Sequence, residues 1–93
     1  MERKVIATGE IAGPWHTGPA APNGCVDGQT ERHVTIWEVF TADYYGTGEH
    51  TYLYQQHWLE NRHGYRSYNG GSTCGDPVWI ADFLRRHNLT LPA

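Results

Sequence analysis

The chain is short of aliphatic side chains and carries little net charge. Leu, Ile, Val and Phe together make up 16 of its 93 residues, about 17%, and a share below roughly 20% predicts disorder only where the net charge is also high. Here the formal net charge is −3. Twelve aromatic residues supply the missing apolar area, since each can bury on the order of 150–250 Å². We therefore expect one folded domain over residues 1–93 with an aromatic core.

The chain also lacks an excess of basic residues and any long apolar run. Seven Lys and Arg stand against ten Asp and Glu, which argues against nucleic acid as the main ligand, because phosphate binding needs clustered cations. The N-terminal residues hold no apolar run typical of a signal peptide. No stretch approaches the roughly 18 apolar residues of a membrane span. These absences predict a cytoplasmic protein without membrane contact.

Cysteine is scarce as well, with only Cys25 and Cys74. The pair is compatible with two free thiols, with a disulfide, or with part of a metal site, and a reducing cytoplasm favours the thiols. The sequence has six histidines, His57 and His63 among them, but no C-x2-C pair of the kind that zinc fingers use. We assign no metal ligands and expect no cofactor, although a metal-binding domain remains an alternative.

Hydrophobic patterning predicts strands over residues 3–12, 32–41, 51–58 and 65–68. Residues 51–63 also fit a helix, with Gly64 after its end, and we prefer the strand. Four Gly and three Pro make residues 13–30 a long irregular loop, and residues 69–75 form a second Gly-rich loop.

The C-terminal helix is the best-defined element. Asp76 can accept free N–H groups as the N-cap, and Pro77 suits the first helical position. An apolar stripe follows at Ile80, Phe83 and Leu84, and Asn88 ends the helix. The predicted fold is α+β, with a small three- to four-stranded antiparallel sheet packed against this one helix.

The candidate binding residues are aromatic side chains on irregular segments. Trp15 and His16 lie in the 13–30 loop, and Tyr44 and Tyr45 follow the 32–41 strand. Rings of this kind anchor protein interfaces, and long loops often bind ligands. We therefore expect a small binding or inhibitory accessory protein that contacts a protein partner or a small ligand through these residues.

The main alternative is a small enzyme using histidine with a carboxylate or a thiol. Cys74 precedes the helix, where the helix dipole favours a reactive thiolate, and His57 or His63 is the candidate base. Glu38, on an otherwise apolar strand face, is the candidate carboxylate. Such a site would suit the subunit interface of a homodimer.

Overall fold

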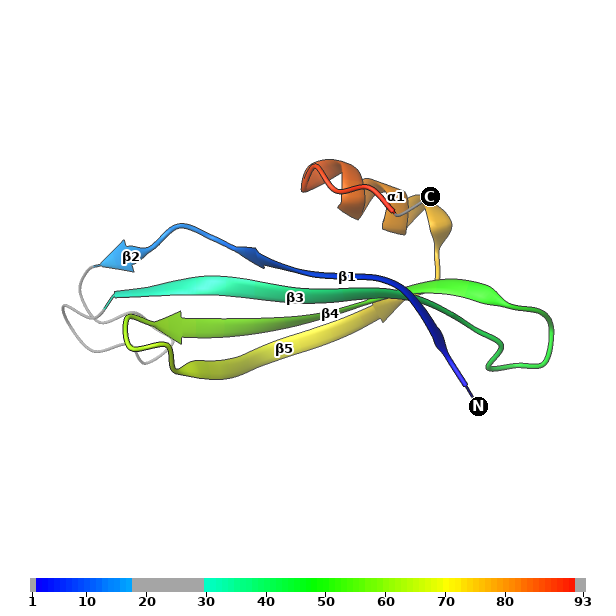
Figure 1. Ribbon diagram of the computed structural model, residues 1–93, viewed down its shortest axis with the longest axis horizontal. Coiled ribbons are helices and arrows are strands. Elements are labelled where there is room, and N and C mark those ends of the chain that lie inside the picture. The colour runs from blue at the N-terminus through cyan, green and yellow to red at the C-terminus, as the bar shows by residue number, and fades with distance from the viewer. Residues whose placement is uncertain (1, 18–29, 92–93) are drawn as a thin grey trace. The chain divides into compact units, whose positions relative to one another are not determined.

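A computed structural model describes residues 2–17 and 30–91, and in these residues it has the α+β fold expected from the sequence. The long strands form an antiparallel sheet in the order β1-β3-β4-β5, and the short β2 pairs with β3 (Figure 1). A single helix follows at the C-terminal end of the described chain. The elements are β1 (Lys4–Ala12), β2 (His16–Thr17), β3 (Thr30–Ala42), β4 (His50–Asn61), β5 (Arg66–Cys74) and α1 (Pro77–Arg86).

By its internal contacts the chain forms two compact units, and each contains a segment of every long strand. Unit 1 comprises Met1–Gly9, Trp37–Gln55 and Gly71–Ala93, and it includes α1. Unit 2 comprises Glu10–Ile36 and Gln56–Gly70, and it includes β2. The units are described separately below.

Unit 1 holds the core that packs the helix on the sheet. Trp37 of β3 is buried and meets Phe83 of α1 edge to face, with ring centroids 6.3 Å apart. Leu53 of β4 and Ile80 of α1 are also buried. Because successive strand residues point to opposite faces, Trp37 and Val39 face the helix while Phe40 lies on the opposite face of β3. The aromatic core expected from composition is therefore present.

The helix begins and ends as its sequence predicts. The Asp76 side chain accepts a 2.8 Å hydrogen bond from the Val78 N–H, and Pro77 occupies the first turn. At the other end His87 is the C-cap. Asn88 follows with φ +54°, a left-handed conformation that a helix cannot continue and that Asn tolerates. Local hydrogen bonding and backbone preference therefore set the two ends of this helix.

The predicted loop at residues 69–75 is wrong, because β5 extends from Arg66 to Cys74. Ladder pairing with β4 outweighs the low strand propensity of its glycines. Within β5, Tyr68 contacts Trp58 whereas Ser72 bonds Gln55. Gly70, with φ +136°, lies between Tyr68 and Ser72 in the sequence.

The predicted 13–30 loop is partly structured. His16 and Thr17 form β2, which pairs with Glu31 and Thr30 of β3, so these parts of the predicted loop are strand. The remainder, residues 18–29 with Cys25, lies outside the described residues.

Candidate functional site

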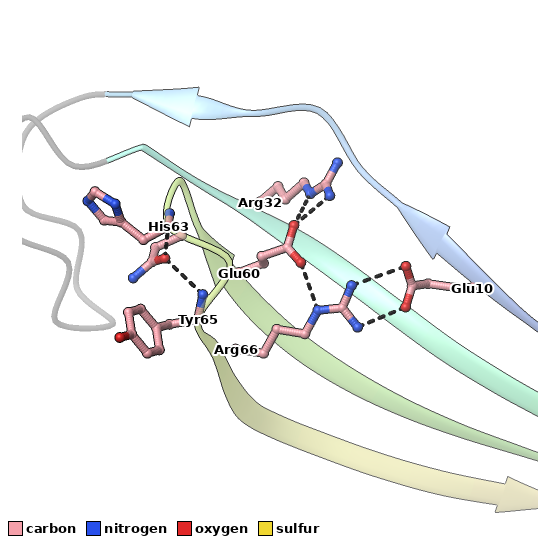
Figure 2. Close-up of polar contacts among 7 residues, drawn as sticks. Glu10, Arg32, Glu60, His63, Tyr65 and Arg66 are labelled. Atoms are coloured by element: carbon pink, nitrogen blue, oxygen red, sulfur yellow. Dashed lines mark hydrogen bonds and ion pairs between the residues drawn. The ribbon is translucent and has the colours of Figure 1, made fainter.

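In unit 2, four charged side chains from four different strands form one network. Arg66 of β5 donates two hydrogen bonds to Glu10 of β1, at 2.8 and 3.1 Å, and its Nε donates to Oε2 of Glu60 on β4 at 2.7 Å. Arg32 of β3 donates through Nε to the other Glu60 oxygen at 2.6 Å. Figure 2 shows these side chains directed toward one another in a row. We call these four residues the charge network.

The β4–β5 turn positions the centre of this network. The Asn61 side chain accepts hydrogen bonds from the backbone N–H groups of His63 and Tyr65, at 2.9 and 3.1 Å (Figure 2). Gly64 has φ +85°, which glycine adopts without strain. This turn sets the register that puts Glu60 and Arg66 within reach of each other.

The members of the charge network shift one another's pKa values. Hydrogen bonds from Arg66 and Arg32 hold the pKa of Glu60 below its usual value, although desolvation opposes this. Arg66 likewise lowers the pKa of Glu10, and the two carboxylates raise the pKa of Arg66. Glu60 is only 7% exposed, so its charge depends on both guanidinium partners. With two positive and two negative groups, the network is neutral and serves to hold the strands together.

The network also positions Trp15, one of the predicted binding residues. The Arg32 guanidinium carbon lies 4.4 Å from the centroid of the Trp15 ring, a cation–π contact. Trp15 is nevertheless 45% exposed. Its neighbour His16 is exposed on β2. Trp15 is thus a ring held at the surface of unit 2 rather than a core residue.

In unit 1, the predicted residues Tyr44 and Tyr45 lie on the loop between β3 and β4, residues 43–49. Tyr44 contacts Tyr52 with centroids 5.1 Å apart and Phe40 with centroids 6.4 Å apart. Phe40 and Tyr52 stack at 5.5 Å. We call Phe40, Tyr44 and Tyr52 the aromatic cluster. Tyr44 remains 45% exposed and Tyr45 is 80% exposed, so the loop is anchored at one tyrosine and presents the other to solvent.

A cation and a carboxylate accompany the aromatic cluster. The guanidinium of Arg3 lies 4.6 Å from the centroid of Phe40 and forms a 2.6 Å ion pair with Glu38. Burial raises the pKa of Tyr52, and the nearby Tyr45, Tyr44 and Asp43 add to this effect. Glu38, the candidate catalytic carboxylate, thus forms an ion pair with Arg3 in this structure.

The other candidate catalytic residues contact their own neighbours. Cys74 is a free thiol at the end of β5, and its sulfur accepts a hydrogen bond from the Asp76 N–H at 3.4 Å. His57 shares a 3.2 Å hydrogen bond with the Thr35 hydroxyl. His63 is exposed in the β4–β5 turn. Cys74 belongs to unit 1, and both histidines belong to unit 2.

A small apolar cavity of about 250 Å³ also lies in unit 1, between α1, the start of β4 and the end of the described chain. Ile80, Leu84 and Leu91 line it together with Thr51, Pro77 and Ala81. It offers carbon surface but little that would orient a polar ligand.

Sequence reasoning missed the charge network. One signal was available, because Glu60 and Arg66 flank a turn and opposite charges facing each other across a hairpin stabilise it. Nothing local connects Glu10 or Arg32 to this pair. Glu10 and Arg66 are 56 positions apart in the chain, and only the folded sheet brings them together.

The fold is thus that of a small α+β protein with a sequential antiparallel sheet and a C-terminal helix. No protein-family model, curated protein or solved structure matches the chain. Within residues 2–17 and 30–91, no group of three or more His, Cys, Asp or Glu side chains could hold a metal ion. No helix in this described part has the length and apolar character needed to cross a bilayer.

Proposed function

We propose that the protein is a small cytoplasmic binding protein that contacts a protein partner through exposed aromatic side chains. The observation that carries this proposal is the arrangement of Tyr44 and Tyr45 on the 43–49 loop. Tyr44 packs against Phe40 and Tyr52, so the loop is fixed by the core, while Tyr45 is 80% exposed. An exposed ring on an anchored loop binds at a small cost in conformational entropy, because few rotatable bonds are ordered on binding.

Trp15 supports the same proposal in unit 2. Its ring is 45% exposed although Arg32 holds it from one side. Trp and Tyr are enriched among residues that dominate binding energy at interfaces. Such a protein acts by covering a surface of its partner, which is also how a small inhibitor works. The free thiol of Cys74 suits a reducing compartment such as the cytoplasm.

The proposal is tested by affinity capture with Tyr45→Ala, using the tagged full-length chain and extract from its own cells. Tyr65→Ala is the matched control, since Tyr65 is 75% exposed and lies in the other unit. Removing an anchor ring costs about 2 kcal/mol or more, roughly 30-fold in Kd. Wild type and Tyr65→Ala should therefore retain one partner that Tyr45→Ala loses, with equal melting temperatures for the two variants. Capture of no partner, or equal capture by all three proteins, would refute the proposal.

A further inference from the structure

The backbone at Trp15 is fixed by contacts with β3 on both sides of this residue. The Gly13 N–H donates a 2.8 Å hydrogen bond to the carbonyl oxygen of His33. After Trp15, His16 pairs with Glu31 as part of β2. All of these residues belong to unit 2. The Trp15 ring is 45% exposed, so the direction of the indole depends on side-chain contacts rather than on burial in a core.

Arg32 makes such a contact, and Glu60 fixes the orientation of its guanidinium. The guanidinium carbon lies 4.4 Å from the centroid of the Trp15 ring. Nε of Arg32 donates to Oε1 of Glu60 at 2.6 Å, and Nη2 lies 2.5 Å from the same oxygen (Figure 2). A planar guanidinium that is bound through two of its nitrogens has a defined orientation. Glu60 therefore determines how Arg32 covers the ring.

Glu60 is itself held from its other side. Its Oε2 accepts a 2.7 Å hydrogen bond from Arg66, which is bound in turn to Glu10. Hydrogen bonds from Arg66 and Arg32 lower the pKa of Glu60, so this carboxyl group is ionised at neutral pH. Glu60 is 7% exposed, which leaves it almost no surface with which to contact a partner. It can act on a partner only through the residues that it holds.

We propose that Glu60 is a positioning residue for Trp15: its negative charge holds Arg32 against the indole and keeps the ring in one orientation. A ring that is already ordered binds at a smaller cost in conformational entropy. This inference rests on the proposed function in one respect, since Trp15 is a binding residue only if that function is correct. It gives a buried side chain a role in preparing an exposed one.

The test is NMR relaxation of the Trp15 indole N–H in the 15N-labelled full-length chain. Trp15→Phe identifies the signal, because it removes one of the four indole signals. In Glu60→Gln, which keeps the size of the side chain and removes its charge, the order parameter should fall from about 0.85 to below about 0.6, the values typical of rigid and flexible groups. The backbone signals of His16 and Thr17 should keep their order, since β2 pairs through the backbone. A ring that is mobile in wild type would overturn the inference.

Glu10→Gln is the matched control. It removes the same charge from the same network, but the hydrogen bonds of Glu10 go to Arg66. We expect the Trp15 ring to stay as ordered in this variant as in wild type. An equal loss of order in Glu10→Gln and Glu60→Gln would refute the positioning role, because the net charge of the network would then decide the result. An ordered ring in both variants would refute it as well.

A double variant keeps the proposal testable if Glu60→Gln does not fold. Arg32→Met combined with Glu60→Gln removes one charge of each sign and leaves the ion pair between Arg66 and Glu10. No single buried charge then loses its partner, which is the change that destabilises a protein most. The Trp15 ring should be mobile in this double variant, with β2 unchanged. An ordered ring would show that neither Arg32 nor Glu60 positions it.

The positioning role and the proposed function fail in different ways. If Glu60→Gln frees the ring but the wild-type chain captures no partner, the positioning role is correct and the proposed function is wrong. If Tyr45→Ala loses a partner that wild type captures, but Glu60→Gln leaves the ring ordered, the proposed function holds and Glu60 does not position Trp15.

Discussion

The close approach of Gly9 to Trp37 leads to a quantitative prediction for the core of unit 1. Trp37 is buried and contacts the helix through Phe83, and its ring lies against the backbone of β1 at Gly9. A Cβ added at Gly9 would lie 2.6 Å from Cζ2 of Trp37 and 2.8 Å from Cε2. Ordinary carbon–carbon contacts are about 3.5–4.0 Å. Gly9→Ala must therefore displace either β1 or a buried indole.

The expected loss of stability follows from two opposing effects. Overpacking a well-filled site costs about 1–3 kcal/mol, and alanine regains about 0.4–1 kcal/mol by restricting the unfolded chain. We expect a net loss of about 1–2 kcal/mol. A domain of this size loses roughly 4–8 °C in Tm for each kcal/mol, so Tm should fall by about 4–16 °C in calorimetry or thermal circular dichroism. The intrinsic fluorescence should also change as Trp37 moves.

Gly13→Ala is the matched control. Its added Cβ would lie 3.4 Å from the carbonyl oxygen of His33, a contact that a small shift relieves. We expect its Tm to stay within about 3 °C of wild type, as for most substitutions away from a buried clash. If Gly9→Ala is as stable as wild type, or if the two variants lose the same stability, the Trp37 ring does not exclude a Cβ at residue 9. The argument would then be wrong.

The remaining predictions concern the charge network and the helix cap. Glu60→Gln should lower Tm more than Glu10→Gln, because Glu60 is buried between two guanidinium groups whereas Glu10 is half exposed; equal effects would contradict the central role of Glu60. Folding lowers the pKa of Glu60 and of Glu10 below 4.5, so their contribution is present above about pH 4.5 and is lost as pH falls through the lowered values. Thermal melts between pH 7 and pH 2 should show Tm falling with pH in this range, and the fall should be smaller for Glu60→Gln. If Glu60→Gln has the same dependence of Tm on pH as wild type, this prediction is refuted. Asp76→Ala should lower the free energy of unfolding measured in urea by about 1 kcal/mol, because the N-cap hydrogen bond is lost. An unchanged free energy of unfolding would mean that another group caps the helix.

The parts of the fold that depend on local chemistry could be predicted from the sequence. Asp76, Pro77 and Asn88 define the ends of the helix by their own hydrogen bonding and backbone preferences. The alternation along β3 identifies its faces, because the strand period is two wherever the strand forms. The composition predicted an aromatic core, and Trp37 is buried in it, whereas Tyr45 on an irregular segment is exposed.

The sequence could not predict features that depend on pairing between distant segments. The 69–75 region contains Gly70 and Gly71 and carries a loop signal, yet it forms most of β5 because β4 lies beside it in the sheet and pairs with it. Local propensity is worth a fraction of a kcal/mol per residue, and a neighbouring strand outweighs it.

The sequence by itself determined the class of fold, the helix and the exposed rings of Tyr44 and Tyr45 as candidates for binding. Only the tertiary structure decided what surrounds those rings. It places Phe40 and Tyr52 against Tyr44 and leaves an oxygen of Asp43 buried without a partner. The physical reason is that periodicity and capping act over a few residues, whereas burial and electrostatic pairing depend on groups that meet only after the strands have paired.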